Sequence, residues 1–341
     1  MIKPPFNSSK NYGFGRAALN AAKRALKRAK GRRFGTLASH TDRFSKFWYW
    51  AKTKHKVADL SDINMEIIYN YAGYLRQRIE RNQLKITYGH NLLSSVNVVY
   101  SCLGQEHRIF IKPSKALGRR QRIRTKPPRL DSEGLQTVFD DMVAEGFERE
   151  QICLELSDTF GLRRREACLL NCRLSVRQAL RLGKVRITKG TKGGRGTNNR
   201  VQRWVEVDES GLQLLLRASS IQGKEENLVP IDLSLIQFFR RIRVARQRFL
   251  SPAGLGHQQD RRAAYACRKF KNLAGVSAPV FGKEEVVEKN LLESSTATLT
   301  AELGHGRKEV LSSYIGSLAK LKREDNDEHA LIFRFLGCAR T

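Results

Sequence analysis

The chain has 341 residues, enough for about two domains that each bury a core. It carries 63 Lys and Arg against 33 Asp and Glu, a formal net charge of +30, while 40% of its residues are hydrophobic. This composition excludes a disulfide-dependent miniprotein and a disordered basic tail, and it makes nucleic acid the expected partner.

No apolar run approaches the 18 residues of a membrane span, and the first residues lack the pattern of a signal peptide. We therefore expect a soluble protein that is not secreted and has no membrane partner. Six cysteines are sparse over this length and are expected to be reduced core thiols: Cys102, Cys153, Cys168, Cys172, Cys267 and Cys338. Cys168 and Cys172 could share a helix face, but no second Cys or His pair stands nearby at ligand spacing, so no metal site is expected.

Residues 1–41 contain ten Lys or Arg and no acidic residue, and the stretch AALNAAKRALKRAKG predicts a basic helix. Two interpretations are open: a helix that contacts phosphates, or an organelle transit peptide. The basic excess continues through the whole chain, which favours phosphate contacts by Lys23, Arg24, Lys27 and Arg28.

From Leu37 to about Leu103 apolar residues recur at helical spacing, and we expect four helices to form a small bundle. The aromatic residues 48–50 could stack on bases, but at this spacing a place in the core is favoured.

Residues 108–129 hold nine Lys or Arg, no acid and three prolines, a composition that neither buries a core nor continues a helix. They predict a basic linker between a domain over 1–107 and a domain over 130–341. A solvated surface is the alternative, but a basic strap can follow a phosphate backbone through Arg119, Arg120, Arg122 and Arg124.

After Leu130, helices are expected near 132–145 and 149–159. Two short strands follow, GKVRIT and RVQRWVEV, joined by the polar stretch KGTKGGRGTNN as a β-hairpin with a long tip. Further helices are expected near 232–250, 262–273, 295–303 and 306–314, and we find no internal repeats. The predicted fold class is mainly α with a small β-sheet or hairpin (α+β).

The chain shows neither the acidic metal ligands of a nuclease or polymerase nor the Gly-rich Lys-Ser/Thr loop of a nucleotide-binding protein. Phosphoryl transfer without a metal needs a side-chain nucleophile, Arg and His to neutralise phosphate oxygens, and an acid for the leaving oxygen. The second half of the chain supplies these types as Arg163 and Glu166 in GLRRREACLLN, Lys192 in TKGGR, Arg262 in RRAAYACRKF, and His305 and Tyr314 in ELGHGRKEVLSSYIG.

In order and spacing, these motifs resemble those of the tyrosine recombinase (phage integrase) family, and the N-terminal bundle is similar to the family's core-binding domain. The resemblance implies a site-specific DNA recombinase that cuts and rejoins strands through a 3′-phosphotyrosyl intermediate, for integration, excision or resolution of a mobile element. It implies no cofactor, double-stranded DNA as partner, dimers and tetramers on DNA, accessory recombination proteins, and a prokaryotic cytoplasmic location at the nucleoid.

By the same resemblance, Tyr314 attacks the scissile phosphate and leaves a free 5′-hydroxyl. Arg163 and Arg262 grip the nonbridging oxygens, His305 adds a hydrogen bond, and Lys192 protonates the departing 5′ oxygen; Lys can give up a proton whereas Arg hardly can. Glu166 would orient Arg163. Lys189 is the alternative acid, but the TKGGR stretch favours Lys192.

One position departs from the family pattern His-x-x-Arg, because Gln259 stands three residues before Arg262 and Ala263 follows it. His257 lies two residues too early. Gln donates a hydrogen bond but cannot carry a proton, so a catalytically weakened, DNA-binding-only protein is the second interpretation and a basic RNA-binding protein a weaker third. The apolar residues 330–333 and 335 could dock on a neighbouring protomer or pack on their own domain.

Overall fold

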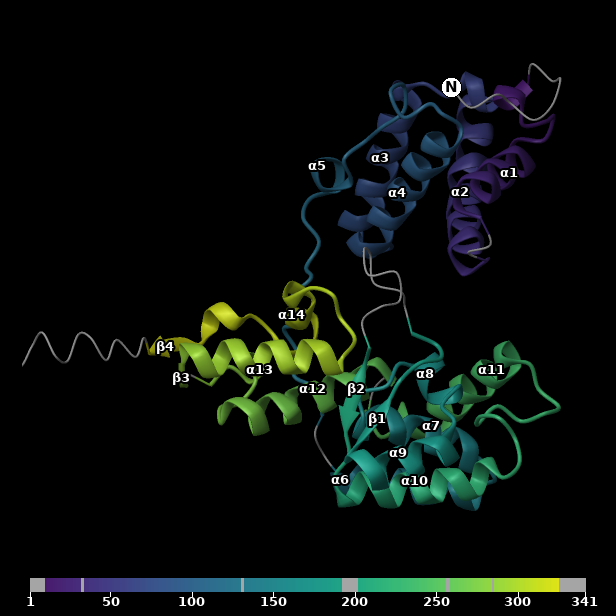
Figure 1. Cartoon of the computed structure of the whole chain (residues 1–341). Helices are drawn as coiled ribbons and strands as arrows, with labels where there is room; N and C mark the ends of the chain where they lie inside the picture. Colours follow the sequence, from purple (N-terminus) through teal and green to yellow (C-terminus); the bar gives the residue numbers. More distant parts are fainter. Residues whose placement is uncertain are drawn as a thin grey trace, which may run out of the picture. The chain divides into compact units, whose positions relative to one another are not determined.

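The computed structural model describes residues 10–31, 34–129, 132–191, 202–255, 258–283 and 285–324. The chain divides into two compact units, Met1–Gln121 and Arg122–Thr341, and this division falls inside the segment 108–129. The described part is mostly helical with two small two-stranded sheets (Figure 1), so the predicted fold class is confirmed.

The first unit is a helical bundle. Its helices are α1 (Ala18–Lys30), α2 (Phe34–His55), α3 (Met65–Glu80), α4 (Ile86–Cys102) and the short α5 (Pro113–Leu117), with 3-10 turns at Lys10–Gly13 and Leu60–Asp62. The expectation of four helices from Leu37 onward is wrong in one respect: only α2, α3 and α4 fall there. The fourth helix is α1, whose Ala21, Ala22, Ala25 and Leu26 are buried in the same core as the other three.

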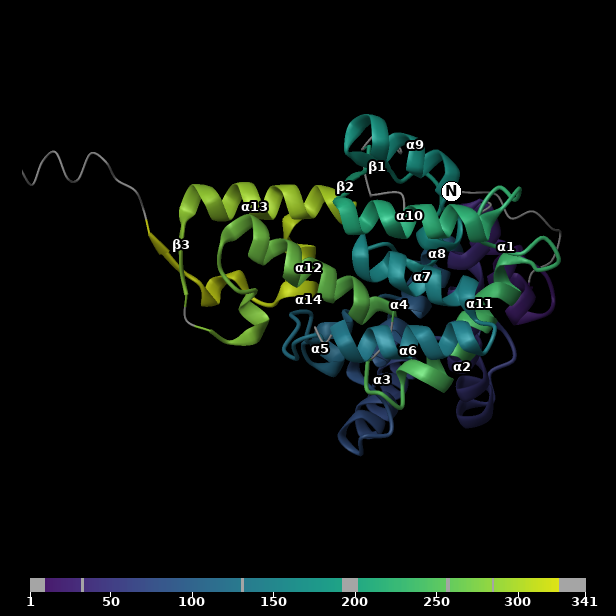
Figure 2. The same cartoon turned by 90° about the horizontal axis from the view of Figure 1, so that it is seen from below.

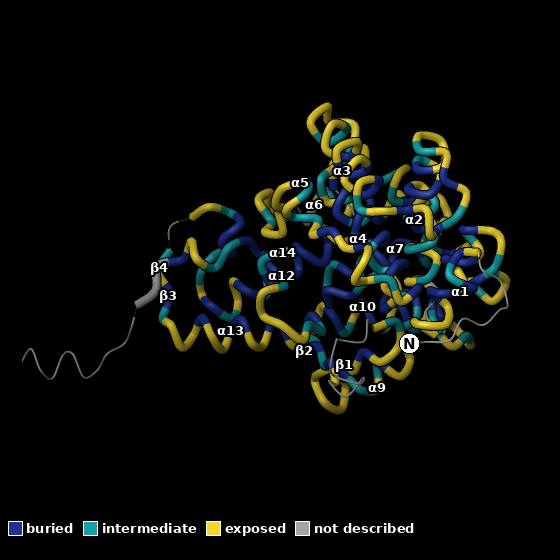
Figure 3. Tube along the Cα trace, turned by 90° about the horizontal axis from the view of Figure 1, so that it is seen from above, coloured by how far each residue is buried: buried dark blue, intermediate teal, exposed yellow. Residues whose placement is uncertain are grey.

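Burial within this unit follows the apolar spacing of the sequence, with the inner helix faces buried and the outer faces exposed (Figure 3). Phe44, Phe47 and Trp48 lie in the core, whereas Tyr49 is 60% exposed. For Trp48 the core interpretation is therefore the correct one. Asn64 begins α3 by accepting the backbone N–H of Ile67 at 3.0 Å, which satisfies a free donor of the first turn.

The expectation that residues 108–129 bury nothing is wrong for the first half of the segment. Ile109, Ile111 and Leu117 are buried in the core of the first unit. Pro113 begins α5 instead of breaking a helix, because the first helical position does not need a backbone N–H. The first half of this basic segment packs its apolar side chains while its Lys and Arg stay at the surface, and the net charge of a segment does not reveal such packing.

The second unit carries the remaining elements. Its helices are α6 (Ser132–Ala144), α7 (Glu148–Thr159), α8 (Arg164–Cys168), α9 (Cys172–Leu182), α10 (Glu209–Gln222), α11 (Leu235–Ala245), α12 (Gln258–Ala274), α13 (Lys289–Glu302) and α14 (Ser312–Ile315). A π-helical turn extends α11 over Arg246–Leu250, and 3-10 turns lie at Pro279–Phe281, Lys308–Leu311 and Leu318–Lys320. The sequence prediction missed α10, which Asp208 caps by accepting the N–H of Gly211 at 2.7 Å.

The predicted hairpin is present as antiparallel strands β1 (Lys184–Arg186) and β2 (Trp204–Glu206), in which Val185 pairs with Val205. Its tip, including Lys192, lies outside the described residues. The second sheet pairs β3 (Val286–Glu288) with β4 (Lys322–Glu324) in parallel. Helix α12 packs against α7, α13 and α14 (Figure 2), so Arg262 lies near the segments that carry His305 and Tyr314.

The apolar segment 330–335, Cys338 and His257 also lie outside the described residues. Within the described ranges, no helix combines the length and the hydropathy that a bilayer span requires.

Candidate active site

Tyr314 lies on α14 with its side chain almost wholly buried, and its hydroxyl faces α12. The hydroxyl oxygen accepts two hydrogen bonds, from Gln259 Nε2 at 3.0 Å and from Arg262 Nε at 3.3 Å. Gln259 and Arg262 are neighbours on one face of α12 because they are three residues apart. The departure from the family pattern therefore lies in direct contact with the candidate nucleophile.

Arg262 is fully buried, and its guanidinium is held from several sides. It donates to the carbonyls of Gly161 and Leu303, and its Nη2 lies 3.3 Å from His305 Nε2. Burial lowers the pKa of Arg262 to about 10, so the group stays charged at neutral pH. The residue thus holds a permanent positive charge directly beside the tyrosine oxygen.

His305 follows the end of α13, and its ring lies 5.4 Å from the ring of Tyr314, centroid to centroid. Burial, and then the charges of Arg262, Arg163 and Arg203, lower the pKa of His305 to about 3. Since Arg262 can only donate, the neutral imidazole accepts at Nε2 and keeps its proton on Nδ1. His305 is therefore a neutral hydrogen-bonding group in the free protein.

The contacts of Glu166 give a reason for the three-residue spacing between Arg163 and Glu166 in the GLRRRE motif. It stands at the third position of α8, where its carboxylate accepts the backbone N–H of Arg163 at 2.7 Å and Arg163 Nη1 at 2.6 Å. The same carboxylate lies 3.8 Å from Arg262 Nη1 and accepts Arg203 Nη1 at 2.5 Å. Burial raises the pKa of Glu166, but the charges of Arg203 and Arg163 outweigh it and hold the pKa below its usual value.

Two glycines of the motifs have a steric reason. Gly161 and Gly304 have φ of +59° and +62°, which side chains rarely adopt. A Cβ on Gly161 would lie 2.4 Å from the ring of Tyr265, and one on Gly304 would lie 2.8 Å from Cδ of Arg203. The tight turns before Arg163 and His305 therefore require glycine.

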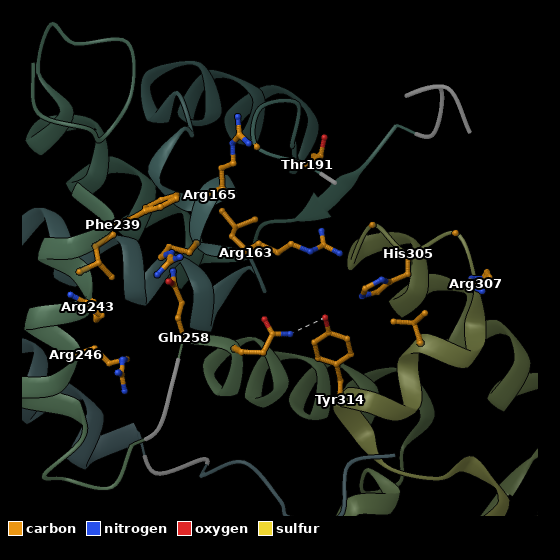
Figure 4. A pocket seen from close by; sticks show the side chains of 18 residues that line it. Arg163, Arg165, Thr191, Phe239, Arg243, Arg246, Gln258, His305, Arg307 and Tyr314 are labelled. Carbon is orange, nitrogen blue, oxygen red and sulfur yellow. Dashed lines mark hydrogen bonds between the residues drawn. The ribbon is translucent and has the colours of Figure 1, made fainter. Parts of the chain in front are cut away.

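Arg163, Gln259, His305 and Tyr314 line a cavity of about 1000 Å³, whereas the buried Arg262 and Glu166 do not line it. Figure 4 shows Arg163, His305 and Tyr314 pointing into it, from three separate segments. Among the described residues, six arginines and no acidic residue line it: Arg163, Arg164, Arg165, Arg243, Arg246 and Arg307. An anion is the ligand that this lining fits. Arg243 and Arg246 were not predicted from the sequence. The pattern that could have identified them is their three-residue spacing at the end of an amphipathic helix.

The two lysines that could protonate the leaving 5′ oxygen, Lys189 and Lys192, differ in what the structure shows of them. Lys189 is half exposed and is ion-paired with Glu226. Lys192 lies outside the described residues, but Thr191, the residue before it, lines the cavity.

The residues predicted to contact DNA differ in how exposed their side chains are. The side chains of Lys23, Arg24, Lys27 and Arg28 are exposed on α1, and Arg119 and Arg122 are exposed in their segment. Arg120 is half-buried, and Arg124 is ion-paired with Asp260 at 2.9 Å, so its charge is already partly neutralised.

In the part of the chain that the structure describes, no group of three or more His, Cys, Asp or Glu side chains is placed so that it could hold a metal ion. Cys168 and Cys172 are both fully buried, as expected for core thiols.

Comparison with known proteins gives one family. Residues 117–268, which include Arg163, Gln259 and Arg262, match the family described as "Integrase". No curated protein matches the chain.

Solved structures share the fold at low sequence identity. The integrase of transposon Tn1549 (residues 82–397), in complex with circular intermediate DNA, is similar with a TM-score of 0.54 and 10% identity over 92% of this chain and 98% of that one. A lambda integrase dimer bound to a core site gives 0.53 and 14% over 87% and 75%. A lambda integrase tetramer bound to a Holliday junction gives 0.54 and 14% over 94% and 79%.

Proposed function

We propose that the chain is a member of the tyrosine recombinase (phage integrase) family and acts as a site-specific DNA recombinase with Tyr314 as its nucleophile; the match of residues 117–268 to the integrase model and the shared fold support this. The observation that carries the proposal is the tyrosine hydroxyl itself. It accepts hydrogen bonds from Gln259 and Arg262 at the floor of a cavity lined by arginines.

The chemistry follows from these contacts. The Tyr314 hydroxyl gives its proton to water in the cavity as its oxygen attacks the phosphorus; the bond from phosphorus to the tyrosine oxygen forms, and the bond from phosphorus to the 5′ oxygen breaks. Two donors on the tyrosine oxygen stabilise the charge it develops as it loses its proton. The phosphodiester energy is kept in the protein–DNA link, so the attack of a 5′-hydroxyl in reverse rejoins a strand.

Arg163 and Arg262 supply the positive charge for the nonbridging oxygens, and neutral His305 adds a hydrogen bond through Nδ1–H. We assign the leaving-oxygen proton to Lys192 rather than Lys189. Support comes from Thr191, the residue before Lys192, which lines the cavity, and from the ion pair between Lys189 and Glu226.

The partner in this proposal is double-stranded DNA, contacted by the exposed basic residues of α1 and by Arg119 and Arg122. The lambda integrase complexes, a dimer at a core site and a tetramer at a Holliday junction, support the assembly of this chain on DNA as dimers and tetramers. We extend the proposal to a mobile element in a prokaryotic cell.

A denaturing capture of protein-linked DNA tests the proposal. Cells making the wild type, Tyr314→Phe or the control Tyr265→Phe are lysed in denaturant, and DNA retained on the protein is sequenced. Tyr265 is a matched control because it is a buried tyrosine of the same unit that donates to Glu302 instead of facing the cavity.

We expect retained DNA with the wild type and Tyr265→Phe, and none with Tyr314→Phe. The retained ends then identify the recombination site. Retention by Tyr314→Phe would refute the assignment of the nucleophile. Absence of retention in every sample, including one with Gln259→His, would favour a protein that binds DNA without cutting it.

A further inference from the structure

Arg203 is a buried basic residue of the hairpin that no sequence motif singled out. It immediately precedes β2, and its backbone carbonyl accepts the N–H of Ile187 on the opposite side of the hairpin at 2.9 Å. Its side chain is only 3% exposed, so it cannot be a surface contact to DNA. Burying a charged guanidinium is costly unless it is paired and hydrogen-bonded, so the role of Arg203 follows from the groups that it binds.

The guanidinium of Arg203 binds three groups on two segments of the chain. Nη1 donates to Glu166 at 2.5 Å, Nη2 donates to the Gly161 carbonyl at 3.3 Å, and Nε donates to the Glu302 carbonyl at 2.5 Å. The first two partners flank Arg163 in the chain, and the third lies three residues before His305. Arg203 therefore connects the segment of Arg163 to the segment of His305.

Arg262 binds the same two segments from the other side, through the carbonyls of Gly161 and Leu303. The two arginines share Gly161 and Glu166 as partners, but only Arg262 touches Tyr314. The close fit of Arg203 is shown by Gly304, where a Cβ would collide with the arginine stem.

The geometry points to Arg203 as a positioning residue that holds Glu166 and the turn before His305, and thereby keeps Arg163 and His305 aimed at one phosphate. Arg203 does not touch the cavity, so its effect on the reaction passes through these two groups. The inference rests on the proposed function and extends it to a residue of the hairpin.

A planar fork is needed for this role. Three donors of one guanidinium point to three partners on two segments, whereas a lysine ammonium cannot reach three such positions in the same geometry. Arg203→Lys keeps the charge and removes the fork, and it is the principal variant. Arg261→Lys is the matched control, because Arg261 is equally buried but binds Asp158 and the Arg129 carbonyl, away from the cavity.

The first experiment measures single-turnover formation of the covalent adduct on a duplex that carries the captured sequence. Arg203→Lys should slow adduct formation about 10- to 100-fold, the usual effect of removing a residue that orients a functional group. The Kd for uncleaved DNA should stay within about threefold of the wild type. An equal loss in Arg261→Lys would show that any buried arginine has this effect and would overturn the inference.

A neutral substrate separates positioning from general damage. In a methylphosphonate duplex, one nonbridging oxygen of the scissile phosphate is a methyl group, so the arginine clamp has no negative charge to neutralise. If Arg203 acts through that clamp, the deficit of Arg203→Lys should shrink to about threefold on this substrate. An unchanged deficit would overturn the inference.

The last measurement does not depend on catalysis. Arg203→Met removes a charge that lowers the pKa of His305, so the NMR titration of His305 should move upward relative to Arg261→Met. An unchanged His305 titration in a folded Arg203→Met protein would overturn the inference. If the wild type formed no adduct but His305 moved as expected, the proposed function would fail while the positioning geometry stood.

Discussion

Glu166→Gln should be the most destabilising single change at the site. The carboxylate is fully buried and accepts Arg163 N–H at 2.7 Å, Arg163 Nη1 at 2.6 Å and Arg203 Nη1 at 2.5 Å. An amide keeps one acceptor oxygen but directs its own N–H groups at arginine donors. Removing one partner of a buried ion pair costs about 3–5 kcal/mol, because the other charge is left without compensation.

For a unit of this size, about 2–4 °C of Tm is lost per kcal/mol, so the expected decrease is about 6–20 °C. The assay is thermal and urea unfolding followed by circular dichroism. Glu226→Gln is the control, since it removes a carboxylate that is largely exposed and pairs with Lys189, a contact worth at most about 1 kcal/mol. A free energy of unfolding for Glu166→Gln within about 1 kcal/mol of the wild type would refute the reasoning.

The difference in free energy of unfolding between the wild type and Glu166→Gln should depend on pH in a definite direction. The folded-state pKa of Glu166 lies below its ordinary value, so the stability it contributes is present above the unfolded pKa of about 4.3. It is lost as the pH falls through the folded pKa. The gap between wild type and Glu166→Gln should therefore be constant from pH 8 to about pH 5 and narrow below about pH 4.

Three further predictions concern neighbouring groups. His305, with a pKa of about 3, should show no NMR titration between pH 8 and 5, and a midpoint near pH 6.5 would contradict this. Because the folded-state pKa of His305 lies below its unfolded value of about 6.5, the stability that the neutral ring contributes is present above pH 6.5 and declines as the pH falls. Gln259→Ala removes one hydrogen bond to Tyr314, worth about 1 kcal/mol, and should slow adduct formation about fivefold, whereas Gln213→Ala on exposed α10 should not. Burial raises the pKa of the Cys172 and Cys267 thiols to about 12, so iodoacetamide at pH 8 should label them only in the unfolded protein; labelling at the rate of a free thiol in the folded state would be the contrary result.

The parts of the site that the sequence could predict are those encoded by short spacings. Gln259 and Arg262 share a helix face because they are three residues apart, and Glu166 reaches the N–H of Arg163 because it stands at the third helical position. The nine residues from His305 to Tyr314 include a short 3-10 helix and the start of α14, and the two rings lie 5.4 Å apart, centroid to centroid. In each case local geometry is enough to place the side chains together.

Arg203 could not be predicted in this way. It stands in a stretch with several basic residues, and its partners are 37, 42 and 99 residues away in the chain. The same reason applies to Arg124, which was expected to contact DNA and is paired with Asp260, 136 residues away. A charged residue does not reveal from its neighbours in sequence whether it is solvated or paired in the interior.

The electrostatics of the site explain why Gln259 is a compatible residue where the family pattern has histidine. Glu166 is one anion among the three cations Arg163, Arg203 and Arg262, so the group carries excess positive charge. The same burial and the same arginines hold His305 neutral. The Gln259 amide donates to the Tyr314 hydroxyl at 3.0 Å and carries no charge, so position 259 orients the nucleophile without adding to this excess positive charge and without carrying a proton.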